Sequence, residues 1–115
     1  MRLARTARLR RRREFLEAQR RGRRIYSGEL LVVALDSGGA VPRIGITVSS
    51  KIGNAVTRNR VKRWIREGWR SVAGGLPPVD LVVIARPAVL AAGPEGVRRA
   101  LAGARDALAA TGRTT

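Results

Sequence analysis

The hydrophobic and polar positions of this chain follow two different periods. Residues 43–50, RIGITVSS, alternate strictly, with Ile44, Ile46 and Val48 on one side and small or polar residues on the other. A period of two is the period of a strand, in which successive side chains point to opposite faces. The segment therefore predicts a half-buried strand with a small, polar face available for a ligand.

Two further runs predict strands that are apolar on both faces. The run GELLVVALDSGG, 28–39, predicts a strand of about seven residues that ends in a turn at 36–39, where Asp, Ser and Gly supply turn conformations. The run DLVVIAR, 80–86, is continuously apolar after its first residue. It predicts a central strand that is covered on both faces.

Three other segments have the composition or the period of helices. Residues 10–21, RRRREFLEAQRR, contain good helix formers and are followed by a glycine that ends the helix. A second helix is predicted to begin at an N-cap residue, either Asn54 or Thr57, and to run to about Ser71, ahead of two glycines and two prolines. A third is predicted from about Pro94. Its apolar residues at helical spacing are Val97, Leu101, Ala104 and Leu108.

The order of these elements is helix, strands, helix, strand, helix. It predicts an α+β fold, a two-layer sandwich of a small sheet with helices against it. At 115 residues the chain is most economically one domain, 1–115, and it contains no internal repeat. Residues 1–9 carry charge without periodicity and are expected to be a disordered basic arm, and the tail 111–115 is expected to fray.

Charge changes this picture most. The chain has 24 Lys and Arg against 8 Asp and Glu, a net charge of +16 and a pI near 12.0. Such an excess indicates a polyanionic partner, for which nucleic acid and anionic membrane are the candidates. Lys51 and Lys62 are the only lysines. The preference for Arg fits bidentate phosphate binding, and it fits a compositionally biased genome equally well.

Candidate chemistry is sparse. The chain has no Cys and no His, which are the usual nucleophile, general base and metal ligands. Catalysis by this chain alone is therefore improbable, and no disulfide or thiolate zinc site is expected. The basic N-terminus is not followed by the apolar region of a secretory signal, and the apolar runs are too short to span a bilayer. The expected location is the cytoplasm.

The second predicted helix divides its residues between two faces. At 100° per residue, Val61, Trp64, Ile65 and Val72 fall on one arc, with Gly68 among them and Trp69 at its edge. The opposite arc carries a row of basic residues at i, i+4 spacing, with two more beside it. The row is Arg58, Lys62, Arg66 and Arg70, and its neighbours are Arg60 and Arg63.

Like charges at this spacing repel each other, and only Glu67 offers local relief. Solvated faces normally mix acids with bases, so this row predicts a helix that follows RNA or DNA phosphates. Trp64 and Trp69 are more readily core anchors than base-stacking platforms. Asn59 fits a base or sugar contact and a solvated side chain equally well, and Phe15 fits core packing and stacking on an unpaired base equally well.

The segment KIGNAVTRNRVKRWIRE, 51–67, follows the strand RIGITVS. Together they resemble the signature of the protein subunit of bacterial ribonuclease P, in which a GNAVxRNRxKRxxRE run follows a VSK-type strand. Three further features match in order: REF at 13–15, the glycine ahead of the first strand at Gly22, and DLVVIAR at 80–86. The resemblance covers residues from about Leu9 to Leu108, and its seventeen-residue core is the specific part.

The resemblance implies a fold and a task. The fold is an αβββαβα sandwich with a four-stranded sheet and a left-handed βαβ crossover, like the second domain of ribosomal protein S5, although about 98% of such crossovers are right-handed. The task is to join a large catalytic RNA that removes the 5′ leader from precursor tRNA, with one protein for each RNA. Mg²⁺ held by the RNA would perform the hydrolysis, so that no catalytic residue and no protein-bound metal are expected.

The resemblance also implies two groups of site residues. Those that match the RNA-contacting motif are Lys51, Gly53, Asn54, Arg58, Asn59, Arg60, Lys62, Arg63 and Arg66, and the basic row adds Arg70. Those that match the cleft for the single-stranded leader are Arg13, Phe15, Gln19, Val33, Thr47 and Ser49.

The chain departs from the family pattern at three positions in or beside these groups. Gln19 and Val33 stand where family members often have aromatic residues, which implies less stacking on leader nucleotides. Ser50 stands before Lys51 where the family commonly has two lysines, which removes one phosphate contact.

Two rival functions are consistent with the charge. A ribosomal or other structural RNA-binding protein would show the same composition, and only the ordered set of motifs argues against it. A cationic protein that binds membrane surfaces would need exposed tryptophans at the edge of an amphipathic helix, which Trp69 could supply. The strand runs and helix breakers argue against this second rival because they predict a folded sheet.

Overall fold

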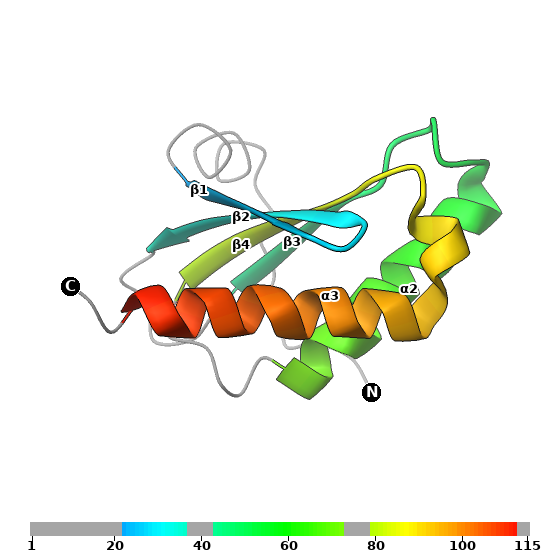
Figure 1. The fold of residues 1–115 in the computed structure, drawn as a ribbon. Helices are drawn as coiled ribbons and strands as arrows, with labels where there is room; N and C mark the ends of the chain where they lie inside the picture. The colour runs from blue at the N-terminus through cyan, green and yellow to red at the C-terminus, as the bar shows by residue number, and fades with distance from the viewer. Residues whose placement is uncertain (1–21, 37–42, 73–78, 113–115) are drawn as a thin grey trace.

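The sheet and the helices form two layers in the computed structural model, which describes residues 22–36, 43–72 and 79–112 (Figure 1). Its elements are β1 (Arg23–Ser27), β2 (Leu30–Asp36), β3 (Arg43–Thr47), α2 (Ala55–Val72), β4 (Val79–Ala85) and α3 (Val89–Gly112). The predicted α+β sandwich is confirmed. The arm predicted at 1–9, the helix predicted at 10–21 and the turn at 36–39 beyond Asp36 lie outside the described residues.

The four strands lie in the order β1-β2-β4-β3. β2 is antiparallel to β1 and to β4, whereas β3 and β4 are parallel. β4 is central, as its continuous apolar sequence predicted. Strand β1, RRIYS, was not predicted from the pattern, because only two of its five residues are apolar and an edge strand needs no continuous hydrophobic face. Gly28, with a φ of 53°, makes the tight turn into β2.

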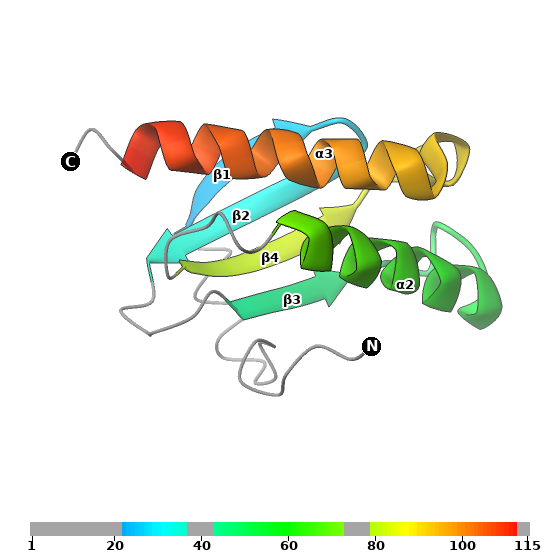
Figure 2. The same cartoon turned by 90° about the horizontal axis from the view of Figure 1, so that it is seen from below.

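The connection from β3 through α2 to β4 has the unusual left-handed sense. In Figure 2, α2 lies in front of the sheet, β3 and β4 both run to the right, and β4 lies above β3. Right-handed crossovers place the second strand on the other side. The handedness implied by the family resemblance is therefore confirmed, and no periodicity in the chain indicated it.

The main core lies between the sheet and the two helices (Figure 1). Leu30 and Val32 of β2, Ile44 of β3 and Leu81 and Val83 of β4 are buried on this face of the sheet. The helix residues that meet them include the four that the spacing of α3 predicted. These are Val97, Leu101, Ala104 and Leu108, and all four are buried.

The opposite face of the sheet, called the open face below because neither α2 nor α3 covers it, carries a second, smaller cluster. Val33 and Val82 are buried there against partly buried Leu31, Leu35 and Ile84. The prediction that β2 and β4 are apolar on both faces is thus confirmed. At one end of this face Arg43 donates two hydrogen bonds to Asp80, of 2.8 Å and 2.7 Å.

The bidentate pair between Arg43 and Asp80 joins β3 to β4 at a position where the two residues are register partners. Asp80 is buried, so the pair satisfies a carboxylate that would be costly to bury alone. It fixes the edge strand β3, from which the chain continues into α2.

The last helix differs from its prediction at both ends. α3 begins at Val89, and Gly93 with a φ of 70° interrupts it directly before Pro94. The long part of the helix therefore starts at Pro94, as predicted, because proline is tolerated in a first turn. At the other end the helix continues to Gly112, past the start of the predicted tail at Thr111. Residues 113–115 lie outside the described residues.

Candidate nucleic-acid interface

The start of α2 is defined by Asn54, which settles the choice of N-cap. Its Oδ1 accepts a hydrogen bond of 3.0 Å from the backbone N–H of Thr57, the arrangement of an N-cap residue. A Cβ at Gly53 would lie 2.9 Å from Cγ2 of Thr57, so this first turn leaves no room for a side chain there. Two predicted RNA-contacting residues, Gly53 and Asn54, therefore also build the helix start.

One stripe of α2 is buried against the core. Its members are Val61, Ile65, Gly68, Trp69 and Val72. Trp69, predicted at the edge of the stripe, is 2% exposed, whereas Trp64, predicted within it, is only partly buried. The two tryptophans therefore exchange their predicted places, because the buried stripe is centred nearer to Trp69 than to Trp64. Both tryptophans pack against the core, so the prediction that they are anchors is confirmed.

Gly68 explains how closely the two helices approach each other. A Cβ at Gly68 would lie 2.8 Å from Cδ1 of Leu101 and 3.4 Å from Cα of Arg98, both in α3. The glycine inside α2 was expected to cost helix stability unless close packing required it. The contact with α3 confirms that requirement.

The most exposed basic face of α2 is not the predicted row. Asn59, Arg60 and Arg63 are exposed, whereas Arg58, Lys62, Arg66 and Arg70 are half-buried. The row therefore flanks the exposed face instead of forming its centre.

A shallow depression lies on this exposed face. It has a volume of about 480 Å³ and is lined by Val56, Asn59, Arg60, Arg63 and Arg66. Four of these were predicted RNA-contacting residues, and the structure brings them around one hollow. Val56, which is 69% exposed, was missed because a single valine in a polar turn gives no signal in the sequence.

Few acids balance the cations of α2. Among the described residues, the ion pair of this helix joins Arg63 to Glu67 at 3.7 Å, and both side chains are well exposed. The first turn holds no acid, although the helix dipole favours acids there. The Nε atoms of Arg58 and Arg70 are buried without a hydrogen-bond partner in the described part of the chain. The helix thus presents cations that its own fold leaves largely unpaired.

The residues predicted for the leader cleft fall into three groups. Arg13, Phe15 and Gln19 lie outside the described residues. Val33 is 1% exposed and packs with Val82 on the open face, and its predicted leader contact stays a prediction. Thr47 is half-buried on the open face, and Ser49 is exposed just beyond β3.

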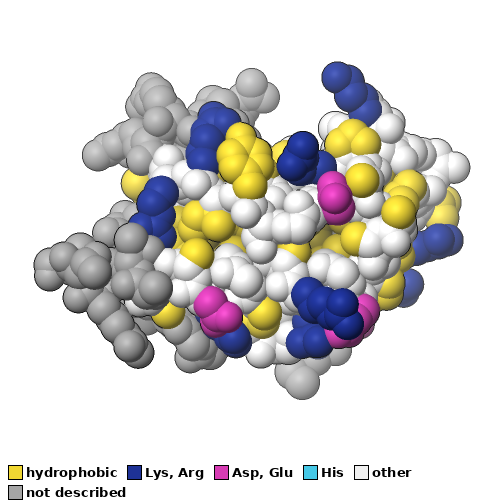
Figure 3. Space-filling view, in the orientation of Figure 1, with side chains coloured by type: hydrophobic (Ala, Val, Ile, Leu, Met, Phe, Trp, Pro, Cys, Tyr) yellow, Lys and Arg dark blue, Asp and Glu magenta, His cyan; other side chains and the backbone are white. Residues whose placement is uncertain are grey.

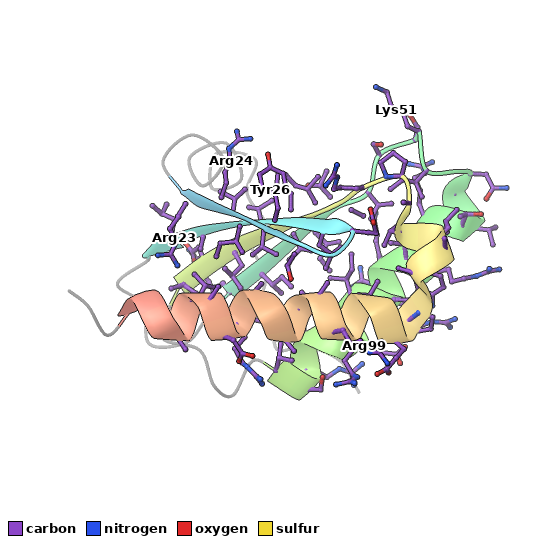
Figure 4. All side chains as sticks on the ribbon, viewed as in Figure 1. Arg23, Arg24, Tyr26, Lys51 and Arg99 are labelled. Atoms are coloured by element: carbon purple, nitrogen blue, oxygen red, sulfur yellow. The ribbon has the colours of Figure 1, made fainter. Side chains whose placement is uncertain are left out.

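Sequence reasoning missed an aromatic residue on the open face. Tyr26 of β1 is 65% exposed, and the guanidinium of Arg86 lies over its ring, 5.8 Å from the centroid. Tyr26, Arg24 and Lys51 all point away from α3 (Figure 4). The signal was available, since Tyr26 is the only tyrosine of a chain poor in aromatic residues, but it requires the unpredicted strand β1 to give it a direction.

No group of three or more His, Cys, Asp or Glu side chains is placed to hold a metal ion within residues 22–36, 43–72 and 79–112. In the same ranges, every helix is too short or too polar to cross a bilayer.

Comparison with known proteins gives a consistent result. The family model described as Ribonuclease P matches residues 3–108. The ribonuclease P protein component of Ruegeria pomeroyi is 45% identical over 103 residues, which cover 81% of this chain and 82% of that protein. That of Desulfatibacillum aliphaticivorans is 45% identical over 82 residues, 70% of each chain.

Solved structures agree with the sequence relatives. The ribonuclease P protein from Thermotoga maritima superimposes with a TM-score of 0.77 at 34% identity, covering 85% of this chain and 94% of that one. The Staphylococcus aureus protein, as a mutant with defective mRNA degradation activity, gives a TM-score of 0.79 at 26% identity, covering 94% and 89%. The chain therefore belongs to the family of ribonuclease P protein components, which places it in a ribonucleoprotein with an RNA partner.

Proposed function

We propose that this chain binds the catalytic RNA of ribonuclease P and assists it in removing the 5′ leader from precursor tRNA. The RNA performs the hydrolysis with Mg²⁺ that the RNA itself holds, and one protein serves one RNA in the cytoplasm. The protein supplies no catalytic group. Its contribution is to bind phosphates of the catalytic RNA and to hold the single-stranded leader.

The observation that carries the proposal is the set of largely unpaired cations that the fixed backbone of α2 presents. Ile65 and Trp69 hold the helix in the core while Asn59, Arg60 and Arg63 face outward around one depression. The planar guanidinium of arginine pairs bidentately with phosphate. A folded RNA has phosphates at fixed positions, and cations carried on an anchored helix backbone suit such a partner.

The second part of the proposal concerns the leader. We assign it to the open face of the sheet, where Thr47 lies and near which Ser49 and Lys51 are exposed. This face is lined by small and apolar side chains, which suit the unpaired bases and sugars of a single strand better than the closely spaced phosphates of a duplex.

The experiment adds the full chain to ribonuclease P RNA at low Mg²⁺ and measures 5′ cleavage of precursor tRNA. We expect the protein to lower the Mg²⁺ that cleavage requires and to lower KM for a precursor with a leader of several nucleotides. Tight binding to ribosomal RNA without any stimulation of cleavage would instead favour a structural RNA-binding protein.

A matched control uses the RNA alone at high Mg²⁺. Because the proposal assigns the chemistry to the RNA, the RNA alone should cleave precursor tRNA at the same position as the holoenzyme. Cleavage that depends on the protein at every Mg²⁺ concentration would contradict this division of labour.

A further inference from the structure

Tyr26 is the most exposed aromatic residue in the described part of the chain. It lies on β1, 65% exposed, on the open face of the sheet. Its neighbour Ile25 packs against the main core, so alternation along the strand turns Tyr26 to the other side. A single exposed apolar residue is ordinary on a protein surface and would not by itself indicate a site. The surroundings of this ring are less ordinary.

Two arginines border the ring. The guanidinium of Arg86 lies 5.8 Å from the ring centroid. Its backbone is fixed there, because the N–H of Arg86 donates a 3.0 Å hydrogen bond to the carbonyl of Glu29 in the β1–β2 turn. Arg24 is exposed two residues before Tyr26 on the same face (Figure 4). In the same orientation, Figure 3 shows basic side chains on both sides of an exposed hydrophobic group over β1.

The strand register connects this ring to the rest of the open face. Tyr26 pairs with Leu31, Leu31 with Ile84, and Ile84 with Thr47. These four residues form one row across the sheet, in which Tyr26 and Thr47 are three strand spacings, about 14 Å, apart. The row runs from the face assigned to single-stranded RNA to the exposed ring at the sheet edge.

An unpaired nucleotide fits this combination of groups. An aromatic ring on a sheet surface offers a plane on which a base stacks, and a nearby guanidinium pairs with the phosphate beside it. A base within a duplex is not available for such stacking. An acidic peptide would use the arginines and leave the ring without a role.

We propose that Tyr26 is a stacking platform for one unpaired RNA base, with Arg24 and Arg86 holding the adjoining phosphates. The inference rests on the proposed function for its source of RNA. The base belongs either to the leader of precursor tRNA or to an unpaired segment of the ribonuclease P RNA. The two sources share one chemistry and are separated by experiment.

The first test is photochemical cross-linking in the holoenzyme assembled from the full chain. 5-Iodouridine is placed in the leader in one sample and in unpaired segments of the ribonuclease P RNA in another. Cross-linked peptides are then identified by mass spectrometry. A cross-link at Tyr26 from either sample supports the proposal and names the source. The proposal is overturned if Tyr26 forms no cross-link in either sample and also none when the protein alone is mixed with a labelled single-stranded oligonucleotide.

The second test compares variants by their affinity for precursor tRNA in the same holoenzyme. Tyr26→Ala should weaken binding roughly tenfold, as expected for one lost stack, and Tyr26→Phe should stay within about twofold of the parent. Arg24→Ala should weaken binding, whereas Arg23→Ala should not. Arg23 is exposed on the same strand but points to the other face, so it controls for the loss of charge.

Leader length separates the inference from the proposed function. If the base is in the leader, the effect of Tyr26→Ala disappears with a leader of one nucleotide. If it is in the catalytic RNA, the effect is seen in affinity for that RNA. Equal affinities of Tyr26→Ala and the parent in both measurements would refute the inference while parent-stimulated cleavage still stands. A parent that does not stimulate cleavage would refute the proposed function, and the oligonucleotide cross-link would still test Tyr26.

Discussion

The two long helices carry their positive charge in different ways. In α3, Arg98 and Arg99 both pair with Glu95, and Arg105 pairs with Asp106. In α2, six basic residues share one acid, Glu67. Both helices pack against the same sheet, and both present arginines to the solvent. Charge that the protein neutralises itself belongs to an ordinary surface, and charge that it leaves unpaired is available to a partner.

The difference in charge pairing also has opposite effects on the stability of the two helices. The i, i+3 and i, i+4 pairs of α3 stabilise that helix modestly, whereas like charges at these spacings destabilise α2. α2 tolerates the repulsion because it is anchored through buried Ile65 and Trp69. The buried face of α2 thus allows its solvent-facing side to carry an excess of positive charge.

The largest expected effect is the salt dependence of RNA binding. If α2 and its flanks engage six to ten phosphates, the affinity for ribonuclease P RNA should fall by roughly 10³ to 10⁵ between 50 and 200 mM salt. Filter binding or fluorescence anisotropy across this range measures the slope. A flat profile would show that the unpaired cations do not meet phosphates.

Paired variants connect that slope to one helix. The double change Arg60→Ala and Arg63→Ala should reduce the slope of log K against log salt by about two, one unit for each phosphate contact. The double change Arg99→Ala and Arg105→Ala removes the same charge from α3 and should leave the slope nearly unchanged. Equal losses from both helices would mean that only net charge matters, and the contrast between them would fail.

The second prediction tests the anchoring of α2. Trp69→Ala should lower the free energy of unfolding by about 3–5 kcal/mol, because it removes a buried indole and leaves a cavity. Trp64→Ala should cost clearly less, since Trp64 is only partly buried. Urea denaturation followed by circular dichroism gives both values. Equal losses of unfolding free energy would contradict the finding that Trp69, and not Trp64, lies near the centre of the buried stripe.

Sequence periodicity predicted much of this anchoring and little of what surrounds it. The buried positions Val61 and Ile65 follow directly from the 3.6-residue period, and the burial of β4 follows from its continuous apolar run. The predicted burial of Trp64 and Trp69 was exchanged because a helical wheel fixes the relative angles of side chains but not the direction in which the sheet lies. That direction depends on contacts with α3, such as the approach at Gly68.

The parts that the sequence could not predict depend on partners distant in the chain. β1 pairs with β2. Its short, largely polar sequence gives only a weak strand signal, so the strand depends on that pairing. The exposure of Tyr26 and the burial of Val33 follow from that pairing. The left-handed crossover came only from the family resemblance, since hydrophobic patterns contain no handedness. The pair between Arg43 and Asp80 needs the register of two parallel strands to be known.

The third prediction uses an inorganic anion as a probe of α2. Sulfate should raise the thermal midpoint relative to chloride at matched ionic strength, because it binds the native cluster of cations. At ten times its Kd the gain would be about 1.4 kcal/mol, or roughly 5 °C for a domain of this size. Differential scanning fluorimetry measures it.

Sulfate also strengthens burial in general, and the variants remove this ambiguity. The general effect should be the same in every variant. The specific part should shrink in the variant lacking Arg60 and Arg63 and persist in that lacking Arg99 and Arg105. Midpoints that are equal in sulfate and chloride for the parent would exclude anion binding at α2.

The smallest expected effect comes from unpairing α3. A hydrogen bond from Arg98, together with the charges of Arg98 and Arg99, lowers the pKa of Glu95 below its ordinary value. The pair therefore stabilises the folded chain above the pKa of the unfolded carboxyl, at about pH 4, and this contribution is lost as the pH falls through the lowered pKa of the folded state. Glu95→Gln should be slightly less stable than the parent at pH 7 and equal to it well below pH 4.

The same variant examines the contrast between the helices from the other direction. Glu95→Gln releases two arginines of α3 and raises the net charge by one, so nonspecific RNA affinity at low salt should rise by no more than a few fold. Cleavage by the holoenzyme should not change, because the cations proposed to bind the catalytic RNA lie on α2. A gain in specific affinity comparable to the loss from Arg60 and Arg63 would show that any unpaired arginine suffices, and that the position of the cations on α2 has no special value.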